Sequence, residues 1–241
     1  MTLVQRLSLN SENAVSYPRT VTMRGKSIEI TDAKRAARVA EMPEIDWIED
    51  RDLRDKVIDA WVAALEAHGF TQIGDMKPSG NYDSNPLLTG TQCDHMRSVC
   101  RLAVKTAEEM AGLFPNFRYD RDILIAGALC HDIGKVWEFQ PDNVKRWKAD
   151  SYAVGFPSVR HPGYGVFICF AMDLPEAVAH IAAAHSAEGE LLERSLENTI
   201  VHWADVTFWK TVEAGRQFAA TDTWLDGMTG GVSGQPRSAK A

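Results

Sequence analysis

Two adjacent ionisable residues, His131 and Asp132, follow the apolar run ILIAGALC and precede the residues IGK. Burying such side chains without partners costs several kcal/mol, so the sequence must supply something that satisfies them. Separate segments of the chain carry further imidazoles and a carboxylate, at His95, His161, His185 and Asp205. Imidazole nitrogens and carboxylate oxygens bind Fe, Mn, Zn, Ni and Co. We therefore expect these side chains to converge on divalent metal, and Asp132 has two oxygens with which to bridge a pair of ions.

The segments that carry these residues have mostly helical periodicity. Residues 92–114 are amphipathic, and residues 120–139 are apolar in their first half, which predicts a central helix. Further helices are expected at 161–174, 175–188 and 196–215. Strand signals are scarce, although RTVTMRGKSIEI alternates weakly and is compatible with a short strand or an arm. The sequence therefore predicts an all-α fold.

The N-terminal third and the tail differ from this helical core. A helix is expected to start at Thr31 or Asp32 and to stop before Pro43, and an apolar stripe from Ile45 to Leu65 predicts a helix that ends at Gly69. Residues 70–91 are loop-like. We expect three parts, namely an N-terminal extension with helices and a long loop packed on the core (1–89), a metal-binding core (90–215) and a C-terminal segment with a disordered end (216–241).

Composition limits the function classes. The chain has 241 residues, 45% of them hydrophobic, and a formal net charge of -7, which argues against nucleic acid and favours a small-molecule substrate. The 4 cysteines form no CxxC pair and are expected to be reduced thiols in a cytoplasmic protein. No apolar window reaches the length of a membrane span, so no membrane partner is expected. A homo-oligomer is compatible with the sequence.

The order of these residues resembles a known pattern. His95, His131-Asp132, His161, His185 and Asp205 match the H…HD…H…H…D pattern of the binuclear branch of the HD-domain metal-dependent phosphohydrolase superfamily, and HDIGK and HWADV carry the resemblance over residues 90–212. It implies an HD-domain helical bundle in which Asp132 and a hydroxide bridge two metal ions. By the same resemblance, His95, His131 and Asp205 complete the first ion's ligands, and His161 and His185 hold the second.

Two basic residues lie close in sequence to the predicted metal ligands. Lys135 lies three residues after Asp132, and in the resembling family this lysine faces the substrate anion. Asp132 and Lys135 are therefore the expected catalytic residues, with Lys135 and Arg160 binding substrate, although a salt bridge of Lys135 to Asp132 or Glu138 explains the lysine equally well. Structural roles are expected for His68 and His180, whereas His202 is either a partner of the ligands or a core polar residue. Aromatic residues between 137 and 167 are interpreted mainly as core, with a pocket lip as the alternative. The segment 140–160 is otherwise expected to be a loop.

These residues predict a metal-dependent hydrolase, with a phosphoester of a small molecule as the first substrate class. Two alternatives stay open. The ligand set also resembles that of mixed-valent diiron oxygenases such as myo-inositol oxygenase. A hydroxide at the same site would also attack a non-phosphorus bond of an aromatic substrate. The metal, one of Fe, Mn, Zn, Ni or Co, is not fixed by these ligands.

Overall fold

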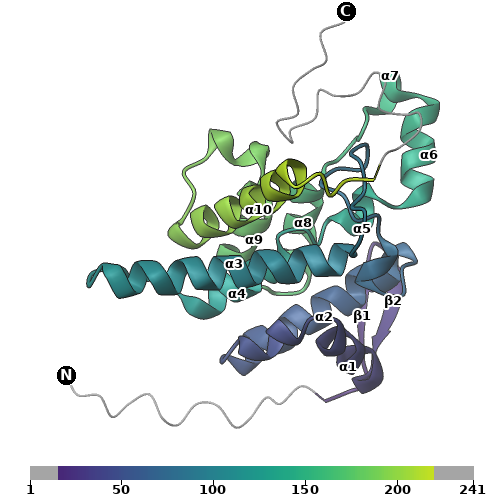
Figure 1. The fold of residues 1–241 in the computed structure, drawn as a ribbon. Helices are drawn as coiled ribbons and strands as arrows, with labels where there is room; N and C mark the ends of the chain where they lie inside the picture. The colour runs from purple at the N-terminus through teal and green to yellow at the C-terminus, as the bar shows by residue number, and fades with distance from the viewer. Residues whose placement is uncertain (1–15, 220–241) are drawn as a thin grey trace, which may run out of the picture.

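The computed structural model describes residues 16–219 and is built mostly of helices (Figure 1). A single two-stranded sheet lies at one side of the described chain. The predicted all-α class is confirmed. The expected disordered end of the C-terminal segment, from residue 220 onward, falls outside the described residues, and the division of the chain at residue 89 stays a prediction.

The weakly alternating segment near the N-terminus forms a hairpin. Strands β1 (Arg19–Met23) and β2 (Lys26–Ile30) pair antiparallel, with Arg19 opposite Ile30. The turn between them places Arg24 and Gly25 at positive φ, 50° and 76°, the conformation of a tight hairpin turn. Helix α1 (Asp32–Glu41) follows, and the Thr31 hydroxyl caps it by accepting a hydrogen bond from Lys34 N–H at 3.3 Å.

Helix α2 (Arg51–His68) is shorter than the apolar stripe predicts. Ile45 belongs instead to the 3₁₀ helix η1 (Pro43–Trp47), because the Asp50 carboxylate accepts hydrogen bonds from the N–H groups of Asp52 and Leu53 and starts α2 there. The predicted end is correct, since Gly69 takes the left-handed conformation with φ of 79°. The 3₁₀ helix η2 (Ile73–Asp75) is the one helical turn in the loop that follows.

Four helices form the core around the apolar segment that precedes His131. Helix α4 (Arg121–Cys130) packs against α3 (Gln92–Leu113), α9 (Glu176–Ala184) and α10 (Leu196–Ala214), and α3 and α10 run alongside each other (Figure 1). Helix α2 covers another side of α4, and Trp61 Nε1 donates to the carbonyl of Leu129 at 3.0 Å. The central position expected for this segment follows from its apolar surface on every side.

Two expectations about the middle of the chain are wrong. The helix expected at 120–139 ends at Cys130, continues as turns and resumes as the short α5 (Lys135–Glu138). Residues 140–160, expected to be a loop, contain α6 (Pro141–Ala149) and α7 (Ser151–Val154). Gln140 caps α6 by accepting from Asn143 N–H at 2.8 Å, and proline at the first helical position favours the start.

The chain then forms α8 (His161–Ala171), packed on α5 and α9, and the 3₁₀ helix η3 (Ala187–Leu191) between α9 and α10. Among residues 16–219, helices that combine the length and the apolar character needed to span a bilayer are absent.

Candidate metal centre

The break after α4 directs His131 and Asp132 into the core. His131 directly follows α4, and its ring packs against the last turn of that helix, with Nδ1 2.7 Å from the carbonyl oxygen of Ala128. The turn then passes so close to the start of α8 that a Cβ on Gly134 would lie 2.6 Å from Gly165 N and 2.9 Å from the His161 carbonyl carbon. The glycine of HDIGK is therefore required by space, and it allows the turn to meet α8.

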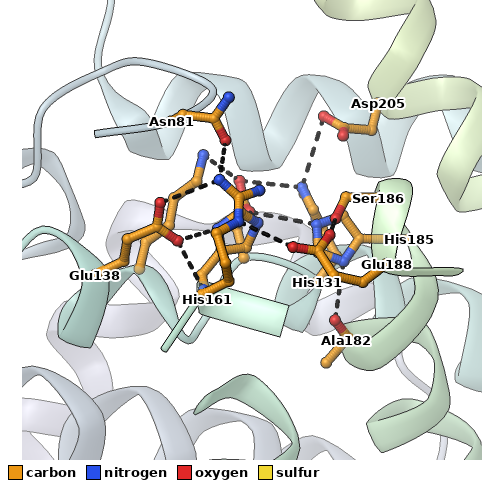
Figure 2. Close-up of polar contacts among 12 residues, drawn as sticks. Asn81, His131, Glu138, His161, Ala182, His185, Ser186, Glu188 and Asp205 are labelled. Carbon is orange, nitrogen blue, oxygen red and sulfur yellow. Dashed lines mark hydrogen bonds and ion pairs between the residues drawn. The ribbon is translucent and has the colours of Figure 1, made fainter. Parts of the chain in front are cut away.

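All the predicted metal ligands lie together in the interior of the core. Figure 2 labels four of them, His131, His161, His185 and Asp205. Their ligand atoms form overlapping groups of three, within 4.8 Å of one another inside each group. Helix α3 supplies His95, α8 supplies His161 and α10 supplies Asp205, while His185 follows the last residue of α9. The members are His95, His131, Asp132, His161, His185 and Asp205.

The Asp132 carboxylate stands at the middle of this cluster and divides it. Its Oδ2 lies 3.2 Å from His95 Nε2 and 3.3 Å from His131 Nε2. Its Oδ1 lies 3.2 Å from His161 Nε2 and 3.6 Å from His185 Nε2. One carboxylate thus presents each of its oxygens to a different pair of imidazoles.

Asp205 joins the first of these pairs. Its Oδ1 lies 3.3 Å from His95 Nε2 and 3.9 Å from His131 Nε2, and Figure 2 shows Asp205 reaching in from α10 on the side opposite Glu138. The two halves of the cluster therefore differ in charge. His95 and His131 pair with two carboxylates of the cluster, Asp132 and Asp205, whereas His161 and His185 pair with Asp132 alone among the cluster's carboxylates.

Two further side chains hold the central carboxylate. Lys135 is 1% exposed, and its Nζ lies 2.6 Å from Asp132 Oδ2 and donates to the carbonyl oxygen of Ser79 at 2.9 Å. Gln92 is fully buried, and its Nε2 donates to the same Asp132 oxygen at 3.0 Å. The salt bridge considered for Lys135 is thus made to Asp132, and the loop that carries Ser79 lies over the lysine.

Arg160 lies near the cluster but is heavily engaged. Its guanidinium pairs with Glu138 at 3.3 Å and with Glu188 at 2.9 Å, and it donates to Asn81 Oδ1 at 2.5 Å. Substrate binding by Arg160 stays a prediction. Its neighbour Glu138 accepts from His161. The sequence suggested Glu138 only as a salt-bridge partner of Lys135, and this contact was not predicted.

Gln92 and Glu138 could have been suspected only in part. Gln92 precedes His95 by three residues, so it shares a helix face with that histidine. Glu138 follows Lys135 by three residues and shares a helix face with that lysine. The residues that they contact in the cluster are distant in sequence, however. Asp132 is 40 residues from Gln92, and His161 is 23 residues from Glu138. Local spacing carries no sign of such contacts.

The remaining histidines lie outside the ligand cluster. His202 contacts it through the backbone, with its Nδ1 2.6 Å from the carbonyl oxygen of His185. His180 Nε2 accepts from Ser195 N–H at 3.2 Å. His68 is buried between the Ala64 carbonyl and the Tyr164 hydroxyl, each 2.8 Å from a ring nitrogen.

The aromatic residues between 137 and 167 serve mainly the core. Trp137 and Tyr164 stack with ring centroids 4.9 Å apart, and Trp147 is fully buried. Tyr152, in contrast, is fully exposed. The main interpretation of these aromatics as core residues fits this arrangement better than the pocket-lip alternative.

Burial and charge together set the protonation of the cluster. Burial lowers the pKa of His95 to about 4 and also lowers the pKa of His185, which favours neutral rings. Burial would likewise lower the pKa of His131, but Asp132 outweighs it and raises that pKa. Burial alone would raise the pKa of Asp132, yet Lys135 and His131 hold it well below its usual range. The central carboxylate is therefore ionised.

These residues fit divalent cations. The donor set combines imidazole nitrogens with carboxylate oxygens, which is the chemistry of borderline metal ions. Asp205 Oδ1 is buried without a hydrogen-bond partner among residues 16–219, although it faces the ring nitrogens of two histidines. A cation between these groups would satisfy a buried acceptor that the described side chains leave unsatisfied.

Comparisons with known proteins agree with this site. The HD domain family model matches residues 93–209, and HD domains bind divalent metals. The chain is also 27% identical over 162 residues, 66% of its length, to a dihydroneopterin 2',3'-cyclic phosphate phosphodiesterase of Methanocaldococcus jannaschii, and the match spans 63% of that relative. No solved structure gives a significant match. Residues 93–209 are an HD domain, and the two matches together support membership of the HD-domain phosphohydrolase superfamily.

Proposed function

We propose that this chain is a metal-dependent phosphohydrolase that cleaves a phosphoester of a small molecule with the help of two divalent cations. The observation that carries the proposal is the division of Asp132, whose oxygens face two separate pairs of imidazoles. A carboxylate in that arrangement suits a bridging ligand, with His95, His131 and Asp205 on one cation and His161 and His185 on the other.

The metals and the protein would share the catalytic work. Bound divalent cations lower the pKa of water at the site and withdraw charge from phosphoryl oxygens. Asp132 fixes the spacing of the two halves of the cluster. The Lys135 ammonium lies against Asp132 and supplies positive charge where phosphoryl oxygens would gather, which favours a transition state of increased negative charge.

The substrate class follows from the relative and from the site. The M. jannaschii protein is named as a phosphodiesterase for a cyclic phosphate. This supports a phosphodiester, cyclic or linear, as the first class to test for this chain. The ligand set keeps the diiron oxygenase and the non-phosphorus hydrolase as alternatives.

The test uses protein freed of metal and reloaded separately with Fe²⁺, Mn²⁺, Zn²⁺, Ni²⁺ or Co²⁺. Bis(p-nitrophenyl) phosphate, p-nitrophenyl phosphate and a 2',3'-cyclic nucleotide are the substrates, and Asp132→Ala is the control variant. We expect phosphoester hydrolysis with at least one metal, and loss of both metal and turnover in Asp132→Ala with helical content retained.

Two results would overturn the proposal. Full activity of Asp132→Ala would remove the cluster from catalysis. Failure of every phosphoester with two metals bound would turn attention to the alternatives, and a mixed-valent iron EPR signal with substrate-dependent O₂ uptake would select the oxygenase.

A further inference from the structure

The outer ring nitrogens of the clustered histidines have different partners. His131 and His185 follow the ends of α4 and α9, and their Nδ1 atoms lie 2.7 and 3.0 Å from the carbonyl oxygens three residues earlier, those of Ala128 and Ala182. The last turn of a helix leaves carbonyl groups without intrahelical partners. These two rings are therefore oriented by their own helices, with Nε2 directed at the cluster.

His161 is in the opposite position, because it is the first residue of α8. A helix N-terminus offers free N–H groups and no free carbonyl, so the Nδ1–H of His161 needs an acceptor from elsewhere. Glu138 supplies it. Its Oε2 lies 2.6 Å from His161 Nδ1 and 2.7 Å from the backbone N of His161, and Figure 2 shows the two side chains facing each other.

This contact adds negative charge to the half of the cluster that contains His161 and His185. His161 and His185 share Asp132 with the other half of the cluster. Among the described residues, Asp205 pairs with His95 and His131 but not with His161 or His185, although one of its oxygens lies within 4.8 Å of a ring nitrogen of His185. Glu138 is 1% exposed, and its carboxylate contacts both His161 and the Arg160 guanidinium, the latter at 3.3 Å. A carboxylate that accepts from the outer nitrogen of a ligating histidine fixes the tautomer and makes the ring a stronger donor.

We propose that Glu138 is a positioning residue that selectively strengthens the cation site formed by Asp132, His161 and His185. This inference rests on the proposed two-metal function. It assigns to Glu138, for the second cation, the negative charge that Asp205 provides for the first.

The experiment titrates metal-free protein with Co²⁺ and counts bound equivalents by equilibrium dialysis and elemental analysis. We expect two equivalents for the wild type, and in Glu138→Gln a roughly 10–100-fold weaker second equivalent with the first unchanged. Glu188→Gln is the matched control, since Glu188 also pairs with Arg160, whereas no hydrogen bond or ion pair within residues 16–219 joins it to His161. It should leave both affinities as in the wild type.

The outcomes separate this inference from the proposed function. If the wild type binds no Co²⁺, the two-metal centre itself fails. If the wild type binds two equivalents and Glu138→Gln binds both equally well, or if Glu188→Gln shows the same loss, the role of Glu138 is refuted.

A second measurement covers the case in which Glu138→Gln does not fold. In the intact wild-type protein, NMR should show the Nδ1–H tautomer of His161, with a proton resonance shifted far downfield by the carboxylate. An Nε2–H tautomer in the metal-free protein would contradict the proposal.

Discussion

The closest backbone approach in the site makes Gly134→Ala an informative perturbation. Real Cβ atoms essentially never come within 3.0 Å of another residue's atoms, yet a Cβ on Gly134 would lie 2.6 Å from Gly165 N and closer still to the His161 carbonyl oxygen. Both obstacles are backbone atoms, so no rotamer change relieves the clash. The turn and the start of α8 must instead move apart by roughly 1 Å, which carries His161 away from Asp132.

The expected effect of Gly134→Ala has two parts, a loss of stability and a loss of turnover. Overpacking of this kind costs about 2 kcal/mol of unfolding free energy, or roughly 4–8 °C in Tm for a chain of this size. A displacement of about 1 Å in a catalytic constellation lowers turnover by about 10²-fold. We therefore expect Gly134→Ala to lose far more activity than stability.

The assay pairs thermal unfolding of the metal-free protein with the turnover of whichever phosphoester the wild type cleaves. Gly163→Ala is the matched control, because it lies in the same helix as His161 and its Cβ would meet only Val159 Cγ1 at an ordinary 3.7 Å. That variant should be neutral or more stable by about 0.5–1 kcal/mol. A Gly134→Ala protein with wild-type Tm and turnover would refute the argument from close approach.

Two further predictions concern single side chains. Lys135→Ala should lower kcat for anionic substrates by about 10²–10³-fold, because it removes the ammonium beside Asp132; unchanged kcat and KM in steady-state kinetics would exclude Lys135 from the site. Burial first, then Asp59, raises the pKa of Tyr17 to about 12 from its ordinary 10.0, so the neutral phenol is favoured in the folded state. Its stabilising contribution should be complete below pH 10 and disappear as pH rises toward 12, and in urea unfolding Tyr17→Phe should show a smaller loss over that range than the wild type.

The sequence predicted the parts of this protein that local patterns determine. Gly69 ends α2 and Thr31 caps α1, as the rules for helix ends require. The candidate ligand residues were predicted because histidine and aspartate are uncommon in apolar helices and because their order resembles a known pattern. Their meeting within bonding distance of one another needed the structure.

The errors have physical causes as well. The apolar periodicity of 120–139 runs through the turn after Cys130, and close packing of Gly134 on α8, which no local pattern reports, breaks the helix. Helices α6 and α7 have few apolar residues and begin at side-chain caps, Gln140 and Asp150. Glu138 was considered only as a salt-bridge partner of Lys135, and its contact with His161 was not predicted because His161 comes from another element.

The order of the ligands along the chain has a consequence for biosynthesis. A nascent polypeptide leaves the ribosome from its N-terminus, so His95 through His185 emerge before Asp205 on α10. Until that last helix docks, four imidazoles share a single aspartate, and the half of the pocket around His95 lacks its second carboxylate. The proposed pair of cation sites is therefore complete only after α10 has been synthesised and has docked.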